Sequence, residues 1–297
     1  MKSYMQVVLA AVCWGMTGLF AKTLTAAGFG QLQLVAVRVV IAAIGMFFII
    51  LFKDKNLFKI KLKDIWCFFG TGFLSLLFFN ICYFQSMQYS TLSVAAVLLY
   101  TAPLFVVVFS TFLFKEKLTI AKCVAMVLMI AGCVFVTGLL SSTGSISVIG
   151  ILFGLGSGFA YALYSIFGRF ALNRGYQPFT VAFYTFLFAS IGILPFSDIS
   201  GMIPLVTVKT SVYMALLGIV SCLLPYILYT KGLIGLENGK ASMISTVEPV
   251  VATLISVFIF GESFTINTAL GILFIVGGIC IMNAQFKKPH IAKSCKH

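Results

Sequence analysis

Long apolar runs, separated by short breaks that carry charge, glycine or proline, make up nearly the whole chain. Most runs are roughly 18 to 24 residues long, which at about 1.5 Å per residue lets a helix cross the roughly 30 Å hydrocarbon core of a bilayer. Barrel strands would be about half as long and would alternate in polarity. The runs predict ten membrane-spanning helices, near residues 4–22, 31–52, 65–86, 92–114, 119–138, 147–168, 178–196, 208–230, 239–260 and 266–285.

The composition agrees with this pattern. Hydrophobic residues make up 61% of the chain and charged residues 9%, with a mean hydropathy of +1.12, whereas soluble domains average about 45–50% apolar and about 25% charged residues. The first run begins almost at Met1, but no small-residue cleavage site precedes a soluble domain and further runs follow at once, so a signal peptide is the poorer interpretation. The sequence therefore predicts an all-α integral membrane protein.

One segment of the sequence occurs twice. A shift of about 146 positions places YTAPLFVVVFSTFLFKEKLT on TVEPVVATLISVFIFGESFT, so that Pro103 aligns with Pro249 and Glu116 with Glu262. A duplicated, mostly apolar chain is typical of secondary transporters, in which two homologous halves enclose one site near the bilayer midplane.

The number of spans fixes how the two copies relate. Five spans per copy is an odd number, so the second copy must enter the membrane in the opposite sense to the first. We therefore expect two inverted five-helix repeats, residues 1–140 and 141–286, followed by a basic cytoplasmic tail, residues 287–297.

The net charge of +13 lies mainly in short segments beside the spans. If the N-terminus is inside, 17 of the 20 Lys and Arg residues fall on the cytoplasmic side, while Lys22 and Lys209 fall outside and Arg38 lies within a span. This asymmetry predicts a multi-pass protein of the cytoplasmic (inner) membrane with both termini in the cytoplasm. Orientation explains the charge, so no nucleic-acid partner is expected.

Glu248 is the only one of the seven acidic residues that lies in the middle of an apolar run. A charge within the bilayer costs from about 2.5 kcal/mol upward, which makes such a residue a functional candidate by default. Pro249 follows it, and Pro103 occupies the matching place in the first repeat; each removes a backbone donor and predicts a helix break. Glu248 could bind a cationic group, couple transport to protons, or only hold the break together.

Arg38 is the corresponding cation within a span, and its guanidinium stays charged. It could pair with Glu248, bind a substrate carboxylate, or extend toward the outer headgroups. Arg38 aligns with Thr185 in the repeat, and Glu248 aligns with Ala102. The two charges are therefore departures from the repeat rather than parts of a shared scaffold.

Aromatic and amide side chains near the expected centre complete the candidate site. In a chain with 31 Phe and 11 Tyr most aromatic residues face lipid or other helices, but an amide in hydrocarbon needs a partner. Gln85 is such an amide outside the main set. The predicted substrate-binding residues are Glu248, Arg38, Trp14, Asn80, Tyr83, Tyr100, Tyr226 and Tyr229, with helix breaks at Pro103 and Pro249.

Other repeated features suit a structural role. Glu116 and Glu262 each precede a threonine by three residues, an arrangement expected at a tight turn that caps the next helix. Glycines within spans three, six and ten are expected to let helices approach closely. These are Gly70, Gly72, Gly154, Gly158, Gly271, Gly277 and Gly278.

Enzymatic chemistry has little support. The two histidines lie in the tail, no span carries paired carboxylates at helical spacing, and G-x-S-x-G is absent from the sequence. The eight cysteines lie mostly in apolar runs without a CxxC pair, so neither a metal site nor a disulfide framework is predicted. We expect no enzyme and no cofactor.

Three signatures resemble one family: the Trp14-Gly15 pair, Arg38 in span two, and the twin segments around Pro103 and Pro249, each followed by a span ending in AG or GG. Over about residues 6–138 and 147–284 the chain resembles the EamA-type carriers of the drug/metabolite transporter superfamily. The resemblance implies a ten-span basket with spans three, four, eight and nine around a central cavity. It is nearly silent on the substrate, since members move amino acids, sugars, nucleotide derivatives, amines or drugs.

These observations predict a secondary transporter that exports a small metabolite, an amino acid or related zwitterion, by alternating access. Arg38 and Glu248 would receive its two charges. The alternatives are an exporter of cationic or lipophilic drugs that uses Glu248 and aromatic residues, and a membrane sensor or channel. A sensor should carry a soluble signalling domain, and a channel a ring of like polar residues. The expected partners are a small-molecule substrate, the lipid bilayer and, through Glu248, protons; the oligomeric state is left open.

Overall fold

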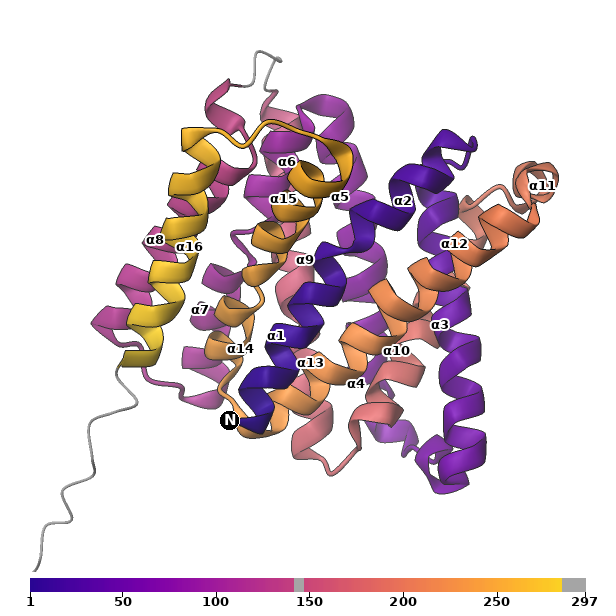
Figure 1. Ribbon diagram of the computed structural model, residues 1–297. Helices are drawn as coiled ribbons and strands as arrows, with labels where there is room; N and C mark the ends of the chain where they lie inside the picture. The colour runs from indigo at the N-terminus through magenta and orange to yellow at the C-terminus, as the bar shows by residue number, and fades with distance from the viewer. Residues whose placement is uncertain (142–146, 285–297) are drawn as a thin grey trace, which may run out of the picture.

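A computed structural model describes residues 1–141 and 147–284, and each regular element in these ranges is a helix (Figure 1). The predicted basic tail, 287–297, lies outside the described residues. The α-helices are α1 (Lys2–Gly15), α2 (Thr17–Ala26), α3 (Gln31–Lys53), α4 (Ile65–Phe69), α5 (Phe78–Tyr89), α6 (Leu92–Leu99), α7 (Ala102–Phe114), α8 (Ile120–Val136), α9 (Val148–Asn173), α10 (Pro178–Ile193), α11 (Ile199–Met202), α12 (Val208–Gly218), α13 (Leu224–Gly235), α14 (Asn238–Ile244), α15 (Val247–Phe260) and α16 (Ile266–Ala284).

Eight helical stretches of the described chain are long and apolar enough to cross a membrane, by length and composition. Two shorter apolar helices correspond to α8 and to most of α16. The described residues thus fit an all-α, multi-pass membrane protein, and the count of ten spans stays a prediction. The eight stretches are Lys2–Ala26, Gln31–Lys53, Leu62–Tyr89, Leu92–Phe114, Val148–Asn173, Pro178–Phe196, Val208–Gly235 and Asn238–Phe260.

Several of these stretches are interrupted, and the interruptions correspond between the two halves of the chain. A π-helical segment, Gly70–Leu77, joins α4 to α5, and another, Ile219–Leu223, joins α12 to α13. The helix breaks between α6 and α7 at residues 100–101, and between α14 and α15 at residues 245–246. The shift that aligns the sequence repeat brings both kinds of interruption into near register.

The two prolines lie just after these breaks. Pro103 and Pro249 belong to the first turns of α7 and α15, where the missing N–H removes a donor that has no partner within the helix anyway. The regular helix is interrupted at the two residues before each first turn, Tyr100–Thr101 and Ser245–Thr246.

Figure 1 shows how the helices are arranged. α8 and α16 pack side by side at one edge, α1 crosses the centre against α13, and α2, α3 and α12 lie toward the other edge. The start of α1 and the end of α16 lie at the same end of the bundle, which we call the N-terminal end. The turn between α7 and α8 also lies there, whereas the turn between α15 and α16 lies at the opposite end.

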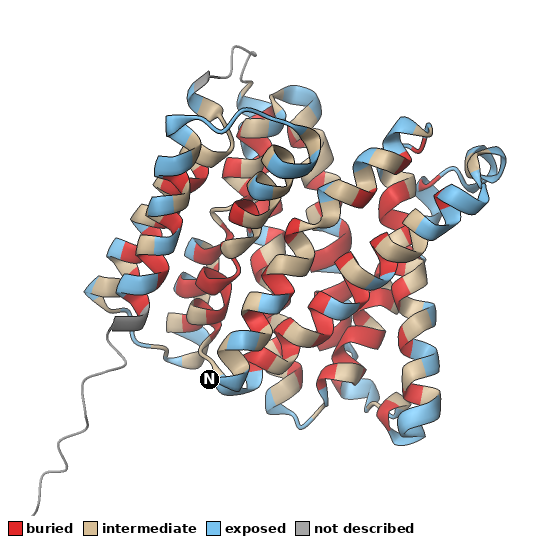
Figure 2. Cartoon of the chain, viewed as in Figure 1, coloured by how far each residue is buried: buried red, intermediate tan, exposed pale blue. Residues whose placement is uncertain are grey.

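Burial separates an interior from an exposed outer surface (Figure 2). One core cluster includes Val7, Met46, Phe186 and Met243, and so joins helices from both halves of the chain. Large apolar side chains also point outward: Phe112 is 80% exposed and its repeat counterpart Phe258 is 81% exposed. Apolar exposure on this scale marks a surface that something apolar covers, as a bilayer would.

Candidate functional site

A cavity of about 260 Å³ lies among the interrupted helices. Residues from α1, α2, α3, α5, α6, α9, α12, α13 and α15 line it, together with Tyr100 at the break between α6 and α7. Seven of the eight predicted substrate-binding residues are among them: Trp14, Arg38, Asn80, Tyr83, Tyr100, Tyr226 and Glu248.

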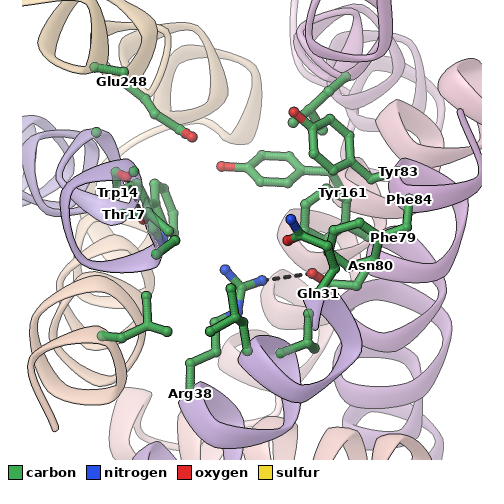
Figure 3. A pocket seen from close by; sticks show the side chains of 18 of the residues that line it. Trp14, Thr17, Gln31, Arg38, Phe79, Asn80, Tyr83, Phe84, Tyr161 and Glu248 are labelled. Atoms are coloured by element: carbon green, nitrogen blue, oxygen red, sulfur yellow. Dashed lines mark hydrogen bonds between the residues drawn. The ribbon is translucent and has the colours of Figure 1, made fainter. Parts of the chain in front are cut away.

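Arg38 enters the cavity from α3 and is oriented by Asn80. Its Nη2 donates to Asn80 Oδ1 at 2.8 Å (Figure 3). Asn80 is only 3% exposed, and its Nδ2 donates to the carbonyl of Leu76 at 2.5 Å. The Leu76 bond fixes the amide so that its oxygen faces the guanidinium, whereas the buried Nε of Arg38 has no hydrogen-bond partner.

Glu248 enters from a different wall, in the first turn of α15 (Figure 3). The start of a helix favours a carboxylate because the helix dipole is positive there. α1 approaches α15 closely at this point, since a Cβ on Gly15 would lie 2.9 Å from the Glu248 carbonyl oxygen. The Trp14-Gly15 pair thus places an aromatic ring beside the cavity and leaves room for the turn that carries Glu248.

Within the described residues, Arg38 and Glu248 do not form an ion pair with each other. Both side chains nevertheless point into the same cavity (Figure 3). A guanidinium and a carboxyl group are therefore presented to one small volume without direct contact between them. That arrangement suits a ligand that carries both charges.

Aromatic rings close the cavity toward the N-terminal end. The ring of Trp14 lies 6.1 Å from that of Tyr161, 5.5 Å from that of Tyr226 and 5.4 Å from that of Tyr229, measured between centroids. Tyr229 lies behind Trp14, outside the cavity lining, and its hydroxyl is hydrogen-bonded to Ser165 Oγ at 2.8 Å. Tyr229 therefore lies behind the wall of the central cavity and lines a small adjoining hollow with Trp14 and Tyr226.

Several other lining residues were not among the predicted ones. Tyr161 aligns with Trp14 in the repeat, and this signal could have identified it. Thr17, Phe79 and Phe84 also line the cavity, but their sequence neighbourhood does not distinguish them from other apolar positions.

Gln85 lies outside the central cavity. It lines a second hollow, of about 710 Å³, formed by the start of α3, the end of α5 and residues 196–198. This hollow shares Gln31 and Phe84 with the central cavity. The central cavity is thus continued toward the end of the bundle opposite the N-terminus.

Comparison with known proteins agrees with this architecture. YwfM of Bacillus subtilis (strain 168), named an uncharacterized transporter, is 25% identical over 297 residues, covering 97% of this chain and 96% of its own. YicL of Salmonella typhimurium, named an uncharacterized inner membrane transporter, is 24% identical and covers 97% of each chain. One crystal structure superposes with a TM-score of 0.80 over 95% of this chain and 96% of its own; at 20% sequence identity this likeness shows the fold alone.

A family profile gives the assignment. The profile of the EamA-like transporter family matches residues 1–138 and again residues 148–284. The two matches cover both halves of the chain that the repeat defines. The protein therefore belongs to the EamA-like transporter family.

Proposed function

We propose that this protein is a secondary transporter for a small zwitterionic metabolite, such as an amino acid. The observation that carries the proposal is that Arg38 and Glu248 enter one cavity from different walls and leave each other unpaired. A substrate carboxylate would accept from the Arg38 guanidinium, and a substrate ammonium would donate to the Glu248 carboxylate. Family membership supports transport across a membrane.

The proposed mechanism is alternating access by two inverted five-helix repeats of ten spans in all, with both termini in the cytoplasm. The matched interruptions, the distribution of basic residues and the common end shared by the start of α1 and the end of α16 support this topology. The two halves would rock about the central cavity. Export is the proposed direction, and it rests on the resemblance to metabolite exporters.

Proteoliposome transport tests the substrate. Purified protein is screened against amino acids, amines, sugars and nucleosides by thermal shift, and each stabilising compound is then tested for transport. Replacing either charge by Gln (Arg38→Gln or Glu248→Gln) removes one charge-assisted bond worth about 1.5–3 kcal/mol, so affinity should fall roughly 10- to 100-fold. Lys209→Gln and Asp54→Asn remove exposed charges remote from the cavity and should leave affinity unchanged.

A second function, export of cationic amines or drugs, is favoured by one observation. The Arg38 guanidinium already donates to Asn80, whereas in the described part of the chain no hydrogen bond or ion pair joins the Glu248 carboxylate to another side chain. A purely cationic ligand would lose affinity in Glu248→Gln and keep it in Arg38→Gln. That result, with amino acids inactive in both assays, would replace the zwitterion proposal by the amine proposal.

A further inference from the structure

The carboxylate of Glu116 caps a helix in the other half of the chain. Its Oε1 accepts from the backbone N–H of Asn238 at 2.6 Å, and its Oε2 accepts from that of Gly239 at 3.1 Å. The predicted tight turn and the capping of the next helix are both present, but the Glu116 carboxylate itself serves α14 and not α8. Thr119 alone caps α8, by accepting from the N–H of Lys122 at 3.3 Å.

The backbone at the end of α7 directs Glu116 toward α14. Lys115 has a left-handed backbone with φ of 56°, and the N–H of Glu116 donates back to the carbonyl of Ser110 at 3.2 Å. This tight turn ends α7. A Cβ on Gly239 would lie 2.9 Å from Val107 Cγ2, so the start of α14 packs directly against α7.

Two further cations hold the same segment of chain. Arg169 donates from Nε to Asn238 Oδ1 at 2.7 Å and from Nη2 to the carbonyl of Leu236. Lys122 Nζ lies 2.9 Å from Glu237 Oε2. We call this set, Glu116, Lys122 and Arg169 on residues 236–239, the Glu116 latch. It joins the α7–α8 turn of the first repeat to α9 and α14 of the second.

Further contacts connect the Glu116 latch to the wall of the cavity. Asn238 Nδ2 donates to the carbonyl of Ser165 at 3.3 Å, and Ser165 Oγ is hydrogen-bonded to the Tyr229 hydroxyl at 2.8 Å. Tyr229 in turn packs against Trp14, which lines the cavity. A connected series of contacts therefore runs from the N-terminal end of the bundle to the cavity wall.

The repeat supplies a counterpart at the opposite end. Glu116 aligns with Glu262, and Asn238 and Gly239 align with Leu92 and Ser93 at the start of α6. Glu262 is exposed, and within the described residues its carboxylate makes no hydrogen bond or ion pair. The Glu116 contact at the N-terminal end thus has an equivalent, that of Glu262, which is not formed. This equivalent lies at the end of the bundle toward which the cavity continues.

We propose that the Glu116 latch holds the N-terminal side of the cavity closed, and that the transport cycle exchanges it for the matching contact of Glu262 with the first N–H groups of α6. This inference rests on the proposed alternating-access function. In both contacts a carboxylate bonds two N–H groups where the helix dipole is positive, so one contact replaces the other with little change in chemistry.

The two contacts are unequal in strength, which explains the conformation observed. Lys122 aligns with Thr268, so the counterpart of one latch cation is uncharged. The other, Arg169, aligns with Lys22, whose ammonium lies over the ring of Phe260 at 3.8 Å. The Glu116 latch therefore has more charged contacts than the Glu262 contact could form. The conformation with the latch formed is the resting state.

The test compares Glu116→Gln with its repeat counterpart Glu262→Gln by hydrogen–deuterium exchange of the full chain in nanodiscs. Glu116→Gln should raise exchange at residues 236–241 and in α9 near Ser165, and lower it at residues 92–94, as the population shifts roughly tenfold or more toward the other state. Glu262→Gln should leave the exchange of the resting state unchanged and slow proteoliposome counterflow.

A purely structural cap gives a different result. Exchange in Glu116→Gln would then rise only at residues 238–240, residues 92–94 would not respond, and Glu262→Gln would transport normally; this outcome would overturn the proposal. The double variant, Glu116→Gln with Glu262→Gln, weakens both contacts. Exchange at residues 92–94 should then return toward the wild-type level. Hydrogen–deuterium exchange needs no substrate. If the substrate screen fails and the exchange pattern is as expected, the proposal of a zwitterionic substrate is refuted and the proposal of the Glu116 latch is not.

Discussion

Two glycines of α16 give a sharp test of helix packing in this protein. A Cβ built on Gly271 would lie 2.8 Å from the carbonyl oxygen of Gly132 and 2.8 Å from the nitrogen of Val136, both backbone atoms of α8. A Cβ on Gly277, six residues later, would meet no atom within 4 Å. Gly271→Ala should therefore destabilise the protein, whereas Gly277→Ala should not.

The magnitude follows from comparing the two variants. Each replaces glycine by alanine inside the same helix, which gains about 0.8–1.0 kcal/mol of helix propensity. The clash in Gly271→Ala involves backbone that cannot rotate away, so α8 and α16 must separate along their contact; overpacking of this kind costs about 1–3 kcal/mol. The propensity gain cancels in the difference, which leaves about 1–3 kcal/mol between the variants.

Thermal unfolding in detergent, followed by intrinsic fluorescence, measures this difference. At roughly 2–4 °C per kcal/mol for a chain of this size class, Gly271→Ala should melt several degrees below Gly277→Ala. Gly277→Ala should equal or slightly exceed the wild type. Equal midpoints for the two variants would refute the reasoning, because they would mean that the α8–α16 contact yields without cost.

Two further predictions concern charges at or just beyond the ends of the membrane-spanning stretches. Burial opposes ionisation of Glu237, but hydrogen bonds from Lys122 and Lys240 outweigh it and hold the pKa of the carboxyl below its usual 4.5. Because the pKa of this carboxyl is lower in the folded state, its ionisation stabilises the folded protein at neutral pH, and that stabilisation is lost as the pH falls below 4.5. The difference in melting midpoint between wild type and Glu237→Gln, which corresponds to under about 1 kcal/mol, should therefore vanish in acid. Asp64, 6% exposed, lies 3.1 Å from Arg174, and Asp64→Asn should cost about 1–3 kcal/mol in the same melts at neutral pH; an unchanged midpoint would show that the pair contributes nothing.

Polar residues within apolar runs were the most informative part of the sequence. Arg38, Asn80 and Glu248 stand out because hydrocarbon cannot solvate them, and a cavity is the place where a helical bundle can keep them wet or paired. All three line the same cavity. Paired prolines were similarly informative, because in both repeats the proline lies in the first turn of a helix that begins just after a break.

Contacts between distant segments could not be predicted in this way. The partner of Glu116 lies 122 positions away in sequence, and no local pattern names it. Gly277 looked equivalent to its neighbour Gly278, yet a Cβ on Gly278 would lie 3.0 Å from the Ala125 carbonyl oxygen and one on Gly277 would meet nothing. Tyr229 was assigned to the cavity and lies behind its wall, because hydropathy does not give the rotation of a helix about its axis.

The π-helical segments have a consequence for how relatives of this protein should be aligned. A π turn takes more residues than an α turn, and each residue added to or removed from a helix rotates everything beyond it by about 100°. One deletion within Gly70–Leu77 would carry Asn80 and Tyr83 off the cavity wall, and one within Ile219–Leu223 would do the same to Tyr226. A single-residue gap at these two places can therefore change the lining of the cavity completely while leaving span length and hydropathy almost the same.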